Sequence, residues 1–244
     1  MAIGTIQVQS EALERPTDYT VFLPDAKKAG PGPYAVLLQL HGKYDSHTSW
    51  LNKTSLVRYT EKLPLIVVMP DGGNFFWANL GQYLKYEDYL INDLWEHVNT
   101  TYPVRTDLRW AIGGLSMGGF GALRLGLKYP QKFGSIFAHS SVIPTQTELE
   151  QSHDFPQDVI PDLDIYALAN KIDQVRMPSL GFDCGTEDVL IGHNRRFHAH
   201  LKKLDIPHTY AEYTGGHTWN YWDMHVQTAL TQHVEALHLP LIAE

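Results

Sequence analysis

Cysteine is almost absent from this chain of 244 residues, which has one, Cys184. A single cysteine excludes a framework of intrachain disulfides. Long apolar runs are missing as well: none approaches the roughly 20 residues that a helix needs to span a bilayer. Residues 1–10 lack the basic start and apolar core of a signal peptide, so the sequence predicts a cytoplasmic protein without a membrane segment.

Positive charge is also scarce, with 19 Lys and Arg against 27 Asp and Glu and a formal net charge of -8. Nucleic acids and anionic membranes attract proteins through clustered Lys and Arg, so neither is expected as a partner. The 13 histidines do not combine with one another or with carboxylates at the spacing of a metal-ligand set, and no metal is expected.

Hydrophobic residues make up 43% of the chain, enough for one large core, and the length suits a single domain over residues 1–244. Alternating apolar and polar residues predict antiparallel edge strands, and continuous apolar runs predict buried parallel strands. Strands and helices then alternate, which predicts an α/β fold: a doubly wound, mostly parallel sheet with helices on both faces. The expected strands are 5–13, 18–23, 34–40, 63–69, 108–115, 133–142, 179–184 and 208–213, and the expected helices are 87–101, 120–129, 194–204 and 219–237.

Two segments interrupt this alternation. Residues 25–33 read as a turn rich in Gly, Pro and Lys. Residues 144–176 are acidic and polar and contain Pro144, Pro156 and Pro161, so they predict an excursion with one short helix. Sheets of this kind carry their substrate pockets at the carboxyl ends of the strands, and we expect the excursion there.

The stretch Gly114-Leu115-Ser116-Met117-Gly118 carries the strongest functional signal. It matches G-x-S-x-G and joins the expected strand 108–115 to the expected helix 120–129, which is the context of a nucleophile elbow. Such a turn is strained and leaves no room for side chains beside the serine. A glycine-rich structural turn is the alternative, but it does not explain small residues on both sides. Ser116 is therefore the candidate nucleophile.

A serine nucleophile needs a histidine that takes its proton and an acid that orients the histidine. In α/β-hydrolases these follow in the order Ser, acid, His. Asp188, just past the strand 179–184, is the candidate acid; Asp183 lies inside the strand pattern and reads as structural, and Glu187 is an intermediate alternative. His217 follows two glycines after the last strand and is the candidate base.

A tetrahedral intermediate also needs N–H donors for its oxyanion, each worth roughly 3 kcal/mol. The amide of Met117 is one candidate, and the amide of Lys43, in the His41-Gly42-Lys43 turn, is the other. Aromatic and polar residues near the strand ends are candidates for the substrate pocket, although core packing explains aromatics equally well. These candidates are His41, Gly42, Trp50, Asn74, Phe75, Phe76, Trp77, His139 and Trp219.

Five segments together resemble the esterase D group of α/β-hydrolases, and within it the bacterial tributyrin-type carboxylesterases: LLQLHGKYDSHTSW, VVMPDGGNFFW, GGLSMGGFGALRLGLKYP, CGTEDVL and GGHTWNYW. They occur in family order over residues 5–234. The resemblance implies hydrolysis of short-chain acyl esters by Ser116, Asp188 and His217, with a small-molecule ester as substrate and no cofactor. It also implies a homo-oligomer, although no stretch of the sequence identifies an interface.

Other functions remain open at this stage. Acetylxylan and feruloyl esterases are relatives, and aromatic pocket residues would suit a sugar or phenolic ring. S-formylglutathione hydrolases usually have an oxyanion loop of the S-G-L-T-C type, whereas this chain has His41-Gly42-Lys43-Tyr44, which weakens the thioesterase alternative. A non-catalytic binding module is opposed by the intact Ser, Asp, His order, although fold alone never proves activity. The Lys43 side chain either extends to solvent or meets an acidic substrate.

Overall fold

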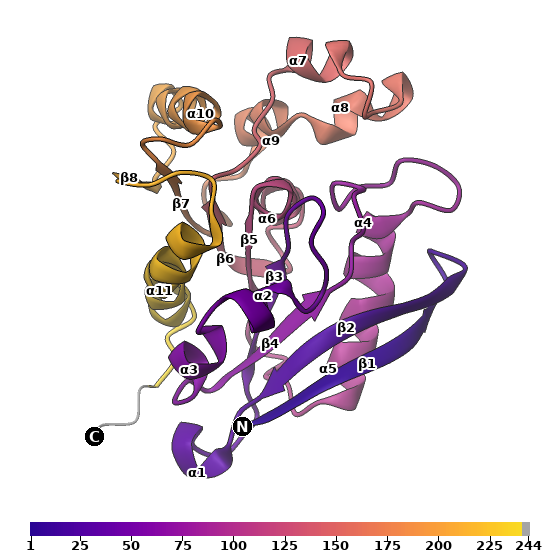
Figure 1. Ribbon diagram of the computed structural model, residues 1–244, viewed down its shortest axis with the longest axis vertical. Helices are drawn as coiled ribbons and strands as arrows, with labels where there is room; N and C mark the ends of the chain where they lie inside the picture. Colours follow the sequence, from indigo (N-terminus) through magenta and orange to yellow (C-terminus); the bar gives the residue numbers. More distant parts are fainter. Residues whose placement is uncertain (241–244) are drawn as a thin grey trace.

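An eight-stranded sheet organises the chain, and the computed structural model describes residues 1–240 of it (Figure 1). The strand order is β1-β2-β4-β3-β5-β6-β7-β8. The pairs β1–β2 and β2–β4 are antiparallel and all the other pairs are parallel, so the predicted mostly parallel sheet is confirmed. The strands are β1 (Ala2–Ser10), β2 (Arg15–Leu23), β3 (Ala35–Leu40), β4 (Leu65–Pro70), β5 (Trp110–Leu115), β6 (Phe133–His139), β7 (Ser179–Gly185) and β8 (Thr209–Tyr213).

Burial along the strands follows their place in the sheet. Every residue of β3, β4, β5 and β6 is buried, because helices cover both faces of these central strands. In β1, an edge strand, exposed and partly buried residues alternate over most of its length. The continuous apolar runs marked central strands correctly, and the alternation of residues 5–13 marked the edge strand β1. Residues 18–23 were also expected at an edge, but they belong to β2, which lies between β1 and β4.

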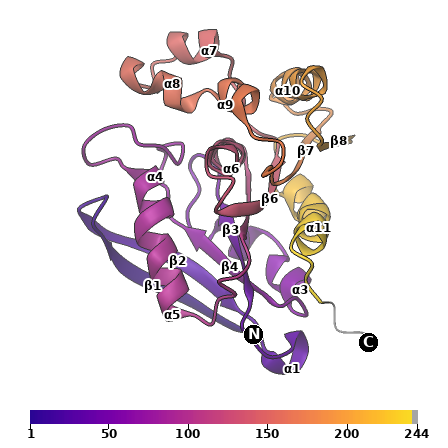
Figure 2. The same ribbon diagram turned by 180° about the vertical axis from the view of Figure 1, so that it is seen from behind.

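Helices from different parts of the chain cover the two faces. One face carries α6 (Met117–Lys128), α10 (Ile191–Lys203) and a continuous helical segment made of α4 (Tyr86–Asp88), the π-helical η1 (Tyr89–Leu94) and α5 (Trp95–Thr101). Figure 2 shows this helical segment lying across β1 and β2. The other face carries α2 (Ser49–Lys53), α3 (Leu56–Thr60) and α11 (Trp219–Ala236). Neighbouring residues of one strand, such as Leu37 and Leu38 of β3, pack into opposite cores.

The excursion, residues 144–176, is more helical than predicted; we call it the cap segment. In place of one short helix it contains α7 (Gln146–Gln151), the 3₁₀ helix η2 (Gln157–Val159), α8 (Ile160–Leu163) and α9 (Ile165–Lys171). Local caps explain these short helices: Thr145 and Glu148 form a capping box, and Asp164 accepts a hydrogen bond from the Ala167 amide. Figure 1 shows α7 and α8 at one end of the molecule, beyond α6.

Three other short helices fall where the sequence predicted none. The expected turn 25–33 contains α1 (Ala26–Ala29), whose first turn is capped by Asp25. Helices α2 and α3 have five residues each, too few for a 3.6-residue apolar period to show. Within residues 1–240, no helix combines the length and the apolar character needed to cross a membrane.

Candidate active site

Ser116 occupies the tight turn between β5 and α6. Its backbone is left-handed, with φ 53° and ψ -115°, a conformation that costs free energy in a residue with a side chain. The Ser116 amide donates to the carbonyl of His139, 2.9 Å away, and so fixes the turn to β6. A Cβ atom on Gly118 would lie 2.4 Å from the Leu40 carbonyl oxygen, so the start of α6 touches the backbone of β3. The small residues of the motif are therefore required by close backbone contact.

Ser116, His217 and Asp188 form a continuous chain of hydrogen-bonding distances. His217 Nε2 lies 3.0 Å from Ser116 Oγ, and His217 Nδ1 lies 2.9 Å and 3.1 Å from the two carboxylate oxygens of Asp188. An ionised carboxylate only accepts, so Nδ1 carries the proton and Nε2 is left to accept from the serine hydroxyl. The structure thus brings together the three residues that the sequence singled out, whereas Glu187 is exposed and Asp183 lies elsewhere.

The electrostatics of Asp188 favour its charged form. Burial by itself would raise the pKa of this carboxyl. Hydrogen bonds from His217, from the Leu190 amide at 2.8 Å and from the Ser140 hydroxyl outweigh burial and hold the pKa of Asp188 below its ordinary value. Asp188 is therefore a stable negative charge beneath His217.

Two residues that the sequence analysis missed support this carboxylate and histidine. Ser140 follows β6 with φ 48°, and its amide donates to the Asp183 carbonyl at 2.8 Å. The indole Nε1 of Trp222, in α11, donates to Ser140 Oγ at 3.2 Å, which leaves the Ser140 proton for an acceptor such as Asp188. The Trp222 ring also meets the His217 ring edge to face, with centroids 4.9 Å apart. A serine directly after the strand beside the elbow strand is the only sequence signal that could have marked Ser140.

The two candidate oxyanion donors lie on either side of Ser116. Met117 is the first residue of α6, so its amide has no intrahelical acceptor. Lys43 lies in the loop after β3, and its neighbour Gly42 is pressed against the elbow: a Cβ on Gly42 would be 2.6 Å from Leu115 Cδ1 and 3.6 Å from Ser116 Cβ. The loop backbone therefore approaches the nucleophile closely enough for an amide to face a reacting carbonyl.

His41 and Asn74 hold this loop in place. Burial lowers the pKa of His41, so its ring is neutral near pH 7. Its Nε2 accepts from the Gly72 amide at 3.0 Å, and its Nδ1–H therefore donates to the Gly42 carbonyl at 2.8 Å. The Asn74 side chain accepts from the Tyr44 amide at 2.7 Å. These contacts tie the loop to residues 72–74.

Burial corrects several of the predicted pocket residues. His41, Trp50, Trp77 and His139 are at most 1% exposed and cannot meet a substrate at the surface. The indoles of Trp50 and Trp77 instead donate to backbone carbonyls of the strand β3 and the loop after it, at 3.0 Å and 3.3 Å. Trp219 is partly exposed and packs edge to face on Trp50, so it remains a candidate for substrate contact.

His139 belongs to a second, fully buried aspartate–histidine pair. Its Nδ1 lies 3.0 Å and 3.1 Å from the carboxylate oxygens of Asp183, and both residues are 0% exposed. Asp183 also accepts from the Tyr221 hydroxyl at 3.1 Å. Asp183 is therefore a buried residue of the strand, as the sequence indicated, and His139 is its partner.

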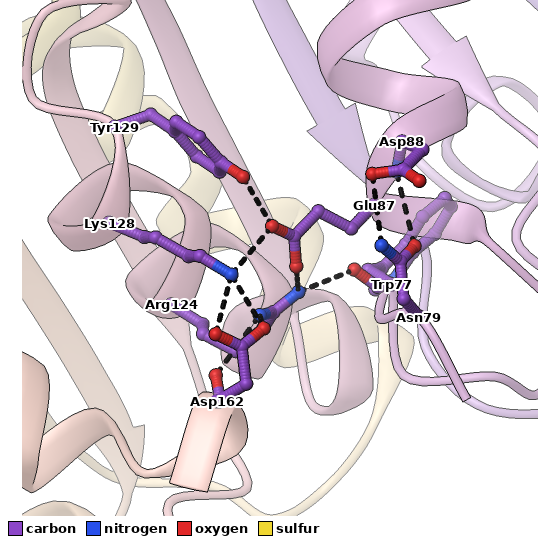
Figure 3. Close-up of polar contacts among 8 residues, drawn as sticks. All are labelled: Trp77, Asn79, Glu87, Asp88, Arg124, Lys128, Tyr129 and Asp162. Atoms are coloured by element: carbon purple, nitrogen blue, oxygen red, sulfur yellow. Dashed lines mark hydrogen bonds and ion pairs between the residues drawn. The ribbon is translucent and has the colours of Figure 1, made fainter. Parts of the chain in front are cut away.

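The base of the cap segment is anchored to α6 by an ionic network around the buried Arg124–Glu87 pair (Figure 3). Arg124 of α6, which is 0% exposed, donates to Glu87 at 2.5 Å and to the Trp77 carbonyl at 3.1 Å. It also donates to the carbonyl of Asp162 in α8 at 3.2 Å, and Lys128 pairs with both Glu87 and Asp162. Burial would raise the pKa of Glu87, but the Arg124 charge and the surrounding hydrogen bonds lower it.

The tip of the cap segment meets the loop after β3, which contains Lys43 and Tyr44, through weaker contacts than those at its base. Phe155 packs edge to face on Phe76, with ring centroids 4.9 Å apart, and Phe76 packs on Phe120 of α6. Lys43 Nζ lies 3.4 Å from Asp154 Oδ2 and over the faces of Tyr44 and Phe76. The cap segment therefore borders the same side of Ser116 as the Lys43 side chain.

Metal ligation has no obvious place in this arrangement. Among residues 1–240, no three or more His, Cys, Asp or Glu side chains gather in a way that could hold a metal ion. The site consists of a serine, a histidine, a carboxylate and backbone amides, which is the equipment for acyl transfer.

Comparison with known proteins gives a consistent result. The Esterase family matches residues 10–233. An acetyl esterase from Caldicellulosiruptor saccharolyticus is 30% identical, over 94% of this chain and 97% of its own length. Among solved structures, the fluorophosphonate-binding serine hydrolase F of Staphylococcus aureus is 26% identical with a TM-score of 0.85, covering 96% of this chain and 98% of that one. An S-formylglutathione hydrolase from the same organism is 25% identical with a TM-score of 0.83 and the same coverage. The chain therefore belongs to the Esterase family and is a serine hydrolase of carboxylic esters with the α/β-hydrolase fold.

Proposed function

We propose that the protein hydrolyses short-chain acyl esters through Ser116, His217 and Asp188, with an acyl-enzyme intermediate. The observation that carries the proposal is the unbroken contact from Asp188 through His217 to the Ser116 hydroxyl, with His217 Nε2 3.0 Å from Ser116 Oγ. A serine hydroxyl is a weak nucleophile without such a base. The left-handed turn presents this hydroxyl at the end of β5, where a substrate carbonyl can reach it.

The reaction proceeds in two steps. Ser116 Oγ attacks the ester carbonyl while its proton passes to His217 Nε2, and the tetrahedral intermediate collapses as His217 returns that proton to the leaving alcohol. A water molecule then gives one proton to His217 and attacks the acyl-serine, and the second collapse releases the acid and restores Ser116. Asp188 keeps the His217 ring in the required tautomer and stabilises its protonated form throughout.

The Met117 and Lys43 amides are the proposed oxyanion donors. Both belong to backbone that is fixed before substrate arrives: Met117 begins α6, and the Lys43 loop is held by His41 and Asn74. Donors that need no rearrangement stabilise the developing charge most effectively, by roughly 3 kcal/mol each. This preorganisation supports acyl transfer over simple binding of an ester.

Short acyl groups are supported by two observations. The relative that is 30% identical is named an acetyl esterase. On the side of Ser116 that faces the cap segment, Phe76 and Phe155 pack against each other and are both buried, so the space beside the nucleophile is limited by fixed rings.

A series of 4-nitrophenyl esters from acetate to laurate, run beside methyl ferulate, tests the proposal. We expect turnover to peak between acetate and butyrate and Ser116→Ala to abolish it in a protein that still folds. A fluorophosphonate probe should label wild type and not Ser116→Ala. If methyl ferulate is hydrolysed faster than the aliphatic esters, the proposed substrate class is wrong. If Ser116→Ala keeps the turnover of wild type, Ser116 is not the nucleophile.

A further inference from the structure

The cap segment meets the rest of the molecule through two carboxylates that are about equally exposed but differ in the number of their partners. At its base, Asp162 contacts Arg124 and Lys128 in the network shown in Figure 3. At its tip, Asp154 is 54% exposed and, among residues 1–240, has an ion pair only with Lys43, at the long distance of 3.4 Å. The base is thus fixed by several contacts, whereas the tip contact can be exchanged for another anion.

The Lys43 ammonium lies beside the cap segment, over an aromatic ring that packs on the start of α6. Its Nζ is 5.5 Å from the centroid of the Phe76 ring. Phe76 packs on Phe120, which lies one helical turn after Ser116 and whose amide donates to the Ser116 carbonyl. The backbone of Lys43 itself lies in the loop that presses on the elbow. The acyl chain of a substrate whose carbonyl lies at Ser116 can therefore extend toward the Lys43 ammonium.

His217 approaches Ser116 from the opposite side. Its ring contacts Trp222, which belongs to the core between the sheet and α11, whereas Phe76 and Phe120 belong to the core on the α6 face. Because His217 protonates the leaving oxygen, the leaving alcohol lies on the α11 side. The acyl group is then the part of the substrate that extends toward Lys43.

The present partner of Lys43 is easily displaced. Exposed ion pairs contribute about 0–1 kcal/mol, because water screens them and both side chains lose freedom. Two other carboxylates, one from the loop after β3 and one from the cap segment, have closer partners: Asp45 pairs with Lys53 at 2.7 Å, and Glu148 pairs with Arg196 at 2.9 Å. Lys43 Nζ thus lies over two aromatic faces while its charge is only loosely neutralised.

We propose that Lys43 Nζ binds a carboxylate at the far end of the substrate's acyl group, taking the place of Asp154, so that the enzyme favours esters of dicarboxylic acids over neutral esters of the same length. This rests on the proposed ester hydrolysis at Ser116. Lys43 then has two separate parts to play: its amide faces the oxyanion, and its side chain selects the acyl group. Asp154 competes with the substrate for the same cation.

Two adipate esters measure this selection directly. Mono-4-nitrophenyl adipate ends in a carboxylate, and methyl 4-nitrophenyl adipate carries the same acyl chain with that charge capped. The readout is the ratio of their kcat/KM values for nitrophenol release at low ionic strength. We expect Lys43→Met to lower the ratio about fivefold and Asp154→Asn, which removes the competing anion, to raise it about threefold. Opposite signs from the two variants distinguish a charge-binding role from general damage.

Lys53→Met is the matched control. Lys53 also lies over an aromatic ring, that of Trp219 at 5.0 Å, and also pairs with an aspartate, but it does so on the α11 side. Its substitution should leave the ratio unchanged. A ratio that Lys43→Met or Asp154→Asn does not move, while both esters are hydrolysed, overturns the selection and leaves the proposed function standing. Failure of wild type to hydrolyse either adipate ester, while it still hydrolyses 4-nitrophenyl butyrate, would overturn the selection alone. Failure on 4-nitrophenyl butyrate as well would overturn both proposals.

Discussion

Two aspartate–histidine pairs with nearly the same geometry lie side by side in this molecule. His217 Nδ1 is 2.9 Å and 3.1 Å from the Asp188 oxygens, and His139 Nδ1 is 3.0 Å and 3.1 Å from those of Asp183. The difference is at the other ring nitrogen. Nε2 of His217 faces Ser116 Oγ, whereas Nε2 of His139 is buried without a hydrogen-bond partner among residues 1–240.

Their origins in the fold explain this difference. His139 and Asp183 are directly paired residues of β6 and β7, so the sheet fixes them and helices cover them. Asp188 and His217 lie beyond the ends of β7 and β8, on loops where the Gly185 backbone packs against that of Gly215. The comparison indicates that a carboxylate–imidazole pair can act as a base only where it is accessible and faces a nucleophile. The aspartate–histidine hydrogen bond by itself fits a buried structural pair as well as a catalytic one.

Asp188→Asn should have the largest effect on catalysis. The amide cannot hold the Nδ1–H tautomer in the same way, so we expect kcat to fall on the order of 10³–10⁴-fold. Steady-state hydrolysis of 4-nitrophenyl acetate measures this, and a thermal melt confirms that the variant is folded. A loss below tenfold would mean that Asp188 does not orient His217.

Asp183→Asn is the matched change in the buried pair, and we expect it to act mainly on stability. The new NH₂ group would face the donors His139 and Tyr221, which leaves a buried donor unpaired and costs about 3 kcal/mol. Urea unfolding measures this cost. The folded variant should keep kcat within tenfold of wild type. A loss of kcat as large as that of Asp188→Asn would erase the distinction between the two pairs.

Glu87→Gln extends the comparison to a buried carboxylate whose partner is an arginine. Arg124 would lose its main counter-charge but keep Asp162, so we expect a loss of about 2 kcal/mol in the free energy of unfolding at pH 7. The pKa of Glu87 is lowered in the folded state, so its contribution is present above the ordinary pKa of a glutamate and is lost as the pH falls through the lowered value.

The pH dependence therefore checks that prediction. The difference in unfolding free energy between wild type and Glu87→Gln should be largest near pH 7 and shrink below about pH 4. A difference that stays constant over this range would show that the charge of Glu87 is not what stabilises the network.

Ser140→Ala should have the smallest effect on kcat, and it also removes the acceptor of the Trp222 indole N–H. The substitution removes one hydrogen bond to the Asp188 carboxylate and keeps the left-handed backbone, so we expect kcat to fall about tenfold. Ser141→Ala is the control, because the neighbouring Ser141 hydroxyl is buried and, within the described part of the chain, has no partner. Equal kcat values for the two variants would show that the Ser140 hydroxyl does not assist Asp188 in catalysis.

The fold and the candidate triad were predictable because local patterns encode them. The unbroken apolar run of β3 and the alternation in β1 distinguished centre from edge, and glycines on both sides of Ser116 marked the elbow. Asp188 and His217 followed from chain order and from their places after strands. Each of these features depends on neighbours within a few residues.

The pocket was predicted poorly because burial depends on residues distant in the sequence. Trp50 and Trp77 stand near strand ends, as a pocket residue would, but their indole N–H groups turn inward to the carbonyls of Leu40 and His41. The hydrogen bond from Trp222 to Ser140 joins residues that are 82 positions apart. The cap helices are too short for periodicity and depend on single caps such as Thr145.

The contact between Gly118 and the backbone of Leu40 and His41 has a consequence for re-engineering the enzyme. Since no side chain fits there, the backbone around Ser116 and the backbone at Leu40 and His41 are tightly packed against each other. We expect most substitutions in this contact to inactivate the enzyme. Residues 43, 76, 154 and 155, by contrast, meet through side chains alone. We expect variation at those four positions to change substrate range more than it disturbs the backbone contact at Gly118.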